Sequence, residues 1–341
     1  MIGKLTMLSS VLFKLTFNSF KLSGKYRHYS KSSFVMMPEG PEVSAVVDNI
    51  NYNLQANSPW SLTGINFVSG RYGLHNPPNG HDNLLKLLPL TLDKVYNKGK
   101  FIYFTFEKNV SIWSTLGLTG WWTFSDHDKN IRFALIFERK NDNQCLKLYY
   151  FDQIGYGTLS IHLEDEELKN KLSSLGPCWI RNRNELTFQM FLKIVCKQRN
   201  SKRIRSPNYL AKFLMNQKFT SGIGNYILSE VLYKCCLHPY TRLPDIEEEE
   251  EWRSLFLAIQ DTVWSSYNSQ SVVRRHAVDN SSQFQMLVYY RDFCPLGNAV
   301  KRETGPHGRT VHWVPSHQYK YKPLEVTTTT TAAEEDIPPD S

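Results

Sequence analysis

The feature that most constrains this chain is a hexapeptide, Met37-Pro-Glu-Gly-Pro-Glu42, that leads into an amphipathic segment. Apolar side chains recur after it at helical spacing, namely Val43, Val46, Val47, Ile50 and Leu54. This pattern predicts a helix from about Glu39 to Leu54 that packs one face on a core. A proline in the first turn lacks only an N–H that would be unpaired there, and two glutamates favour the positive end of the helix dipole. The start of this helix is therefore well defined.

The nitrogen of Pro38 is a secondary amine if the working chain begins at this residue. The helix dipole opposes its protonation by roughly 0.3–2 kcal/mol, which leaves more free amine near neutral pH. Attack by this amine on a sugar C1′ gives a cationic iminium, which makes the C2′ proton acidic and drives strand elimination. Glu39 is placed to carry a proton to the sugar ring oxygen. For an internal proline, however, a rigid turn is the commoner interpretation.

The formal net charge of +8 suggests a polyanionic partner, but this charge is unevenly spread. Residues 1–37 carry five Lys, one Arg and no acid, so the remaining chain is only mildly basic and charge alone is weak evidence for nucleic acid. The six cysteines show no metal or disulfide spacing, which indicates free thiols in a reducing compartment. No stretch reaches the ~18–20 apolar residues of a membrane span, and we expect no membrane association.

The stretch 64–161 contains short apolar runs separated by turns. Such strands, closely spaced and without helices between them, predict an antiparallel sandwich. The runs are 101–106, 111–115, 132–137 and 146–151. Helical patterns follow over 186–196, over 208–216 and from 245 to about 267, and strand-like patterns return at 287–290 and 310–314. The sequence therefore predicts a β-rich half, a helical half and a short β-containing end.

The hexapeptide resembles the start of the Fpg/Nei family of DNA glycosylases (formamidopyrimidine-DNA glycosylase and endonuclease VIII), whose mature chains open Pro-Glu-Gly-Pro-Glu. Similar motifs follow in the same order between Pro38 and Gln318. The resemblance implies an α+β multidomain fold: an N-terminal β-sandwich with flanking helices, then a helical helix-two-turn-helix domain and a zincless-finger β-hairpin. We expect a basic extension over 1–37, the catalytic sandwich over 38–178, the helical domain over 179–283, the finger over 284–318 and a disordered tail over 319–341.

The resemblance assigns catalytic roles to four residues. Pro38 would be the nucleophile and Glu39 the proton carrier. Lys100, at the end of Asn97-Lys-Gly-Lys100, matches the family's catalytic lysine, although a lysine pair at such a turn is otherwise usually just solvated. Arg309, in His307-Gly-Arg-Thr310, takes the place of the finger arginine and would bind the phosphate beside the lesion.

Four further residues are expected at the DNA interface. Glu42 would serve as a supporting carboxylate. Leu118 takes the place of the side chain that fills the gap left by a flipped nucleotide, and Tyr156 keeps an aromatic wedge. Asn225, after Gly222-Ile-Gly224, matches the asparagine with which the family contacts the DNA backbone, and a helix that begins there would offer free N–H groups to a phosphate.

Two stretches depart from the family pattern. Many relatives carry arginines against the orphaned base where this chain has Ile154 and Gly155, so opposite-base discrimination is not expected to follow the family. Relatives that hold 8-oxoguanine have a longer capping loop than the polar segment 268–283. This difference favours oxidised pyrimidines and formamidopyrimidines as substrates.

The expected finger lacks the four cysteines of most bacterial relatives and holds only Cys294. An alternative zinc set of Cys294, His307, His312 and His317 is too unevenly spaced for the usual pairs, so we expect no metal. A zincless finger resembles that of some eukaryotic and viral Nei-like enzymes. No cofactor is expected, because hydrolysis and elimination would proceed through the protein's own amine.

Residues 1–36 resemble a mitochondrial presequence with a cleavage motif at Arg27-His-Tyr-Ser30, which predicts a mitochondrial or nuclear protein. An untranslated stretch or a disordered basic arm is an equal alternative. Cleavage near Tyr29 would leave residues ahead of Pro38 and bury its nitrogen in an amide. Catalysis therefore requires initiation at Met37 with removal of that Met, or further trimming.

The sequence thus predicts a bifunctional DNA glycosylase and lyase of base excision repair that acts as a monomer. Its partner would be damaged DNA, with duplex, single-stranded and bubble substrates all open. The main alternative is a non-catalytic DNA-binding protein on the same scaffold, if Pro38 is acylated. A second alternative is an RNA-binding or structural module.

Overall fold

The computed structural model describes residues 37–54, 59–73, 76–127, 129–139, 141–142, 144–199, 208–270 and 284–319. The presequence-like stretch, most of the polar segment 268–283 and nearly all of the expected tail lie outside these described residues. None of the helices within them is both long and apolar enough to cross a membrane.

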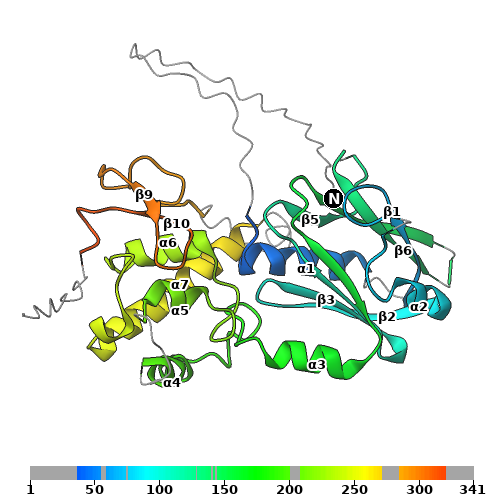
Figure 1. Ribbon diagram of the computed structural model, residues 1–341, viewed down its shortest axis with the longest axis horizontal. Helices are drawn as coiled ribbons and strands as arrows, with labels where there is room; N and C mark the ends of the chain where they lie inside the picture. The colour runs from blue at the N-terminus through cyan, green and yellow to red at the C-terminus, as the bar shows by residue number, and fades with distance from the viewer. Residues whose placement is uncertain are drawn as a thin grey trace, which may run out of the picture. The chain divides into compact units, whose positions relative to one another are not determined.

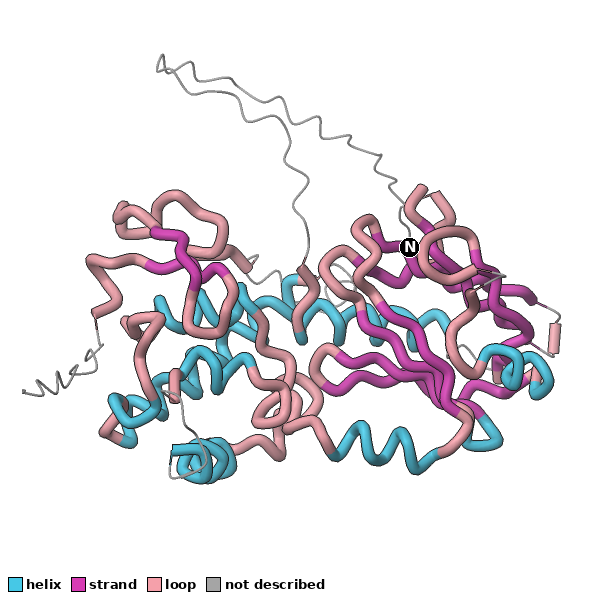
Figure 2. The backbone as a smooth tube through the Cα atoms, viewed as in Figure 1, coloured by secondary structure: helices cyan, strands magenta, loops and turns pink. Residues whose placement is uncertain are grey.

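The first half of the described chain is an antiparallel β-sandwich built from eight strands in the order β5-β7-β6-β1-β2-β3-β4-β8. The strands are β1 (Trp60–Phe67), β2 (Leu90–Lys98), β3 (Phe101–Phe106), β4 (Ser111–Thr115), β5 (Gly120–Thr123), β6 (Ile131–Arg139), β7 (Gln144–Asp152) and β8 (Thr158–His162), with a 3₁₀ turn η1 (Glu107–Asn109). Alternate side chains of β3, such as Ile102 and Phe104, are buried in its core. The predicted α+β fold with an N-terminal sandwich is confirmed (Figures 1 and 2).

Three helices flank the sandwich: α1 (Gly40–Leu54), α2 (His81–Leu87) and α3 (Asp165–Ser173). Helix α1 begins and ends as the hexapeptide pattern predicts, and it packs against both β2 and helix α7 (Glu249–Ser269). Helix α2 was not expected, because 64–161 was predicted to hold strands only. Its two turns bury a single side chain, that of Leu84, so the sequence carries no periodic signal there.

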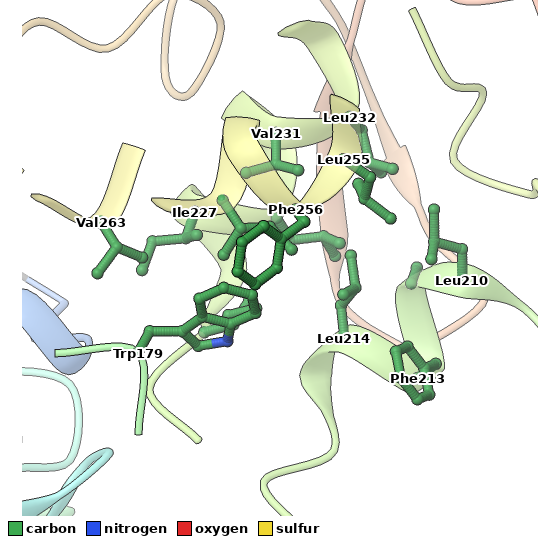
Figure 3. Close-up of a cluster of buried hydrophobic side chains, with 14 of the residues drawn as sticks. Trp179, Leu210, Phe213, Leu214, Ile227, Val231, Leu232, Leu255, Phe256 and Val263 are labelled. Carbon is green, nitrogen blue, oxygen red and sulfur yellow. The ribbon is translucent and has the colours of Figure 1, made fainter. Parts of the chain in front are cut away.

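The second half is helical, with α4 (Phe188–Arg199), α5 (Leu210–Met215), a 3₁₀ turn η2 (Leu243–Asp245), α6 (Asn225–Lys234) and α7. Figure 3 shows its core, in which Trp179, Ile227 and Phe256 pack together among leucines and valines. This second core contains none of the buried side chains of the sandwich core. The residues of α6 are buried on nearly every side, which fixes the start of this helix relative to its neighbours.

A hairpin of β9 (Lys301–Thr304) and β10 (Thr310–Trp313) follows the helices, within the range where the finger was expected, and we refer to it as the finger hairpin. The predicted strand at 287–290 is wrong, since this segment forms a turn. Its shape follows from Glu230 of α6, whose carboxylate accepts the three successive backbone N–H groups of residues 287, 288 and 289 at 2.7, 3.0 and 2.9 Å. Successive N–H groups of a strand point to opposite sides and could not converge on one carboxylate.

Three glycines join distant parts of the chain backbone to backbone. The N–H of Gly40 donates to the carbonyl of Gly222 at 2.8 Å, and a Cβ at Gly40 would lie 2.9 Å from the Gly222 Cα. A Cβ at Gly99, in the β2–β3 turn, would lie 2.6 Å from the Cβ of Ser221. The start of α1, the β2–β3 turn and the segment before α6 therefore meet where Gly40 and Gly99 leave no room for a side chain, and we call this contact of Gly40, Gly99 and Gly222 the glycine junction.

Candidate active site

A pocket of about 450 Å³ lies beside the glycine junction. It is lined by six of the residues that the sequence singled out: Pro38, Glu39, Lys100, Leu118, Asn225 and Arg309. These residues come from the start of α1, the β2–β3 turn, the β4–β5 turn, the start of α6 and the finger hairpin. Of the other two expected residues, Glu42 is buried behind Glu39, and Tyr156 is exposed on a neighbouring loop.

Glu39 is held at the start of helix α6. Its carboxylate accepts the backbone N–H of Tyr226 at 2.9 Å and that of Ile227 at 3.3 Å. Burial raises the pKa of Glu39 to about 7, with Lys100 and the two N–H groups opposing this shift. A carboxyl group with such a pKa holds its proton near neutral pH and is suited to general acid catalysis.

Lys100 occupies the two-residue turn between β2 and β3, directly after Gly99. Burial lowers the pKa of its amine, and Glu39 opposes this shift while Arg309 adds to it. A Cβ built on Gly224 would lie 2.1 Å from Lys100 Nζ and 2.2 Å from Glu39 Cδ. The amine and the carboxyl group therefore both border the space that a side chain at residue 224 would fill, and glycine leaves this space open.

We expect Gly224→Ala to lower the rates of base release and strand cleavage by about 10²-fold while leaving the fold intact. The φ of Gly224 is −131°, which alanine adopts readily, and the added methyl would meet only the ends of two flexible side chains. A displacement of about 1 Å at a reacting group is enough for such a loss. Gly73→Ala, where no atom lies within 4 Å of the new methyl, is the control. Wild-type rates in Gly224→Ala would show that the added methyl does not displace Glu39 or Lys100.

Glu42 is a buried carboxylate that lies behind Glu39 and accepts several hydrogen bonds. One of its oxygens accepts the backbone N–H of Glu39 at 2.9 Å. The hydroxyl groups of Tyr226 and Ser266 donate to the carboxylate at 3.0 and 2.9 Å, and the amide of Gln270 donates at 3.1 Å. Since these groups reach Glu42 from α1, α6 and α7, this residue holds the elements around the pocket together.

Pro38 is buried at the pocket wall, and in the chain of 341 residues its nitrogen is bonded to Met37. The Met37 side chain packs on the helical core, and its sulfur accepts the hydroxyl of Tyr289 at 3.7 Å. An amide nitrogen has lost its free electron pair to resonance and is not a nucleophile. The proposed chemistry therefore depends on the removal of Met37.

Asn225 links helix α6 to the finger. Its amide donates to the carbonyl of Thr310 at 2.6 Å, and its side-chain oxygen lies 3.0 Å from Nε2 of His307. Burial lowers the pKa of His307 to about 4, with Arg309 adding to the shift, so its ring is neutral and can donate to that oxygen. The turn that carries Arg309 is thus fixed to α6. The sequence indicated His307 only as a candidate zinc ligand, and no sequence signal indicated its hydrogen bond to Asn225.

The loop that carries Tyr156 is fastened to the turn that carries Leu118. Asp152 is buried and accepts the hydroxyl of Thr119 and the N–H of Gly157, and the same hydroxyl accepts the N–H of Ile154 at 2.9 Å. Tyr156 and Ile154 are 61% and 45% exposed at the loop surface. Asp152 and Thr119 were not expected at the site, although an acid at the end of an apolar strand was an available signal for Asp152.

The four residues of the alternative zinc set do not form a cluster. Within the described ranges, no group of three or more His, Cys, Asp or Glu side chains is arranged to hold a metal ion. His307 is engaged with Asn225, and Nε2 of His317 lies 3.3 Å from the sulfur of Cys236. His312 is buried between the rings of Tyr289 and Tyr290.

Comparison with known proteins adds to this geometry. Residues 37–159 match the family model described as the formamidopyrimidine-DNA glycosylase N-terminal domain. The chain is 26% identical over 259 residues to a formamidopyrimidine-DNA glycosylase of Thermus thermophilus, covering 73% of this chain and 90% of the relative. It is 23% identical over 289 residues to endonuclease 8 of Escherichia coli, covering 83% of this chain and all of the relative.

Solved structures share the fold. A Lactococcus lactis Fpg, solved with DNA that contains an abasic site, superposes with a TM-score of 0.62 at 19% identity, covering 82% of this chain and 99% of that one. MutM, solved with DNA that contains a carbocyclic 8-oxoguanine, superposes with a TM-score of 0.64 at 20% identity, covering 83% of this chain and all of the other. The arrangement of sandwich, helices and terminal hairpin is thus that of Fpg structures.

Proposed function

Starting from the relationship of this chain to the Fpg/Nei family of DNA glycosylases, we propose that it is a bifunctional glycosylase and lyase of base excision repair. The observation that carries this proposal is the convergence of Pro38, Glu39, Lys100 and Arg309 on one pocket. An amine, a proton donor and two cations around one cavity match the needs of a Schiff-base lyase on a phosphodiester chain.

The reaction begins with Pro38 as a free secondary amine. Its nitrogen attacks C1′ of the damaged nucleotide and the bond to the base breaks, and the base takes up the proton that the secondary amine loses. Glu39 gives a second proton to the sugar ring oxygen. Ring opening leaves a cationic iminium between Pro38 and C1′. This iminium draws electrons from the neighbouring C2′–H bond, so that loss of the proton expels the 3′ phosphate. A second elimination then expels the 5′ phosphate, and hydrolysis returns the free amine.

Lys100 and Arg309 supply positive charge to the phosphates that leave. Arg309 has no hydrogen bond or ion pair to any other described side chain, and it lies at the pocket rim where a phosphate can meet its guanidinium. Lys100, with its lowered pKa, is suited both to hold a phosphate and to exchange a proton. Asn225 would meet the DNA backbone from the start of α6, and Leu118 and Tyr156 would fill the space left by the extruded base.

We further propose oxidised pyrimidines and formamidopyrimidines as the substrates, a zincless finger and monomeric action in the mitochondrion or nucleus. The exposed Ile154 presents no hydrogen-bonding group to an opposite base, which supports weak discrimination among opposite bases. The non-catalytic alternative on the same scaffold stands if the natural chain keeps any residue ahead of Pro38.

The test is a cleavage assay with the protein isolated from its own cells. Duplexes that carry a single oxidised pyrimidine or an abasic site are incubated with the protein, and mass spectrometry identifies both its N-terminus and the DNA ends. We expect an N-terminal Pro38 and a gap with phosphate on both ends. Salt-dependent binding without cleavage would instead establish the non-catalytic alternative.

A further inference from the structure

The pocket beside Pro38 has a second cationic wall. Lys98, the last residue of β2, and Lys171, in the last turn of α3, line it together with Lys100 and Arg309. The only carboxyl group among the lining residues that the structure describes is that of Glu39. Glu39 is drawn toward the N–H groups of α6, so the wall formed by α3 and β2 carries positive charge without a counterion of its own.

Both lysines are held in place rather than extended into water. Nζ of Lys98 donates to the carbonyl of Leu172 at 2.8 Å and keeps two further N–H groups for another acceptor. Nζ of Lys171 lies 5.3 Å from the centre of the Phe101 ring, which is itself part of the pocket wall. Within the described chain, neither amine forms an ion pair with a carboxylate. Two ammonium groups that face one pocket without an anionic partner leave that wall able to accept an anion.

The charges along α3 are arranged so that Lys171 has no carboxylate partner on its own helix. Asp165, Glu166 and Glu167 all lie in the first turn, and none of them lines the pocket. Lys169 pairs with Asp165 at 2.7 Å and is 64% exposed. Lys171, two residues later, turns instead toward the pocket. The negative end of the helix dipole attracts any cation in the last turn, but it does not require that the cation face a cavity.

We propose that Lys98 and Lys171 bind a phosphate of the damaged strand on the α3 wall of the pocket, away from the finger that carries Arg309. The inference rests on the proposed function, since DNA supplies the phosphate. A nucleotide leaves the base stack by rotation of its backbone, so it is held best when phosphates on both sides of it are fixed. Arg309 and Asn225 hold one side, and the two lysines hold the other.

The test is the salt dependence of binding to a duplex that contains a tetrahydrofuran abasic analogue, which cannot form the iminium. Each phosphate contact contributes about 0.9 to the slope of log K against log salt. Lys171→Gln in the full chain is therefore expected to lower this slope by about 0.9 and to weaken binding about eightfold at 0.1 M salt. Lys169→Gln removes the same charge from the same helix and is expected to leave the slope unchanged.

The outcomes separate this inference from the proposed function. Equal slopes for Lys171→Gln and Lys169→Gln, with both variants as thermally stable as the wild type, would overturn the phosphate contact alone. Failure of the wild type to prefer the analogue duplex over an undamaged one would overturn the proposed function itself. Lys171→Arg keeps the charge and is expected to keep the wild-type slope, because the contact with the phosphate is electrostatic.

Discussion

Chains that keep Met37 are expected to form no borohydride-trapped adduct with an abasic duplex, whereas chains that begin at Pro38 are expected to form one readily. Borohydride reduces the iminium between the amine and C1′ and so fixes the protein to DNA. The nitrogen of Pro38 can form this iminium only when Met37 is absent, because an amide nitrogen does not attack. Gel electrophoresis of the trapped complex, after initiation at Met37 with and without removal of that Met, measures the difference.

Two controls make the result specific. Pro38→Gly at the chain start replaces the secondary amine with a primary one and should give a partial yield, and acetylation of Pro38 should reduce the adduct to background. Lys100 carries the other amine with a lowered pKa in the pocket, so it is the competing nucleophile. An adduct from the capped chain that disappears in Lys100→Met would transfer the nucleophilic role to Lys100 and refute the assignment of Pro38.

Glu39→Gln is expected to slow release of a damaged base by about 10²–10⁴-fold at pH 6, which is the usual contribution of a general acid. The substitution keeps the shape of the side chain and its oxygen acceptor for the N–H of Tyr226. Trapping on a preformed abasic site should fall by no more than about tenfold, since an abasic sugar opens to its aldehyde without a proton from Glu39. Single-turnover kinetics on the two substrates provide the comparison.

The pH profile follows from the raised pKa of Glu39. The group binds its proton up to a pH of about 7, well above the usual range of a glutamate, so base release by the wild type should decline as the pH rises through 7. The residual activity of Glu39→Gln should lack this decline. If the variant lost trapping and base release equally, Glu39 would have a structural role only.

Local patterns in the sequence were sufficient for most of the fold. Strand β3 alternates buried and less buried residues, and α1 places its apolar residues on one face, so both could be predicted from spacing. Helix α2 was missed because a seven-residue helix with one buried side chain has no detectable period. The segment 287–290 has strand-forming residues, but the buried Glu230, far away in the sequence, bends it into a turn.

The candidate site was predictable only as a set of residue types in familiar motifs. Spacing alone could not show that Glu39 and Lys100 both lie beside Gly224, since this arrangement joins three separate segments. It also could not show that His307 bonds to Asn225 rather than to a metal, or that Asp152 fastens the loop that carries Tyr156. These are tertiary contacts between groups that leave no local periodicity. The domain limits and the roles of the individual site residues stay predictions.

The glycine junction limits how this protein can diversify. Glu39, Lys100 and the start of α6 are brought together where the main chain at Gly40, Gly99 and Gly222 is in close contact, so any side chain added at Gly40, Gly99 or Gly224 would disturb the acid and the amine. Selection for a new lesion has to act instead on segments whose contacts are made by side chains, such as the loop that carries Tyr156 and the finger hairpin. The catalytic residues would then stay in a fixed arrangement, while the preference for one lesion over another would change through the surrounding segments.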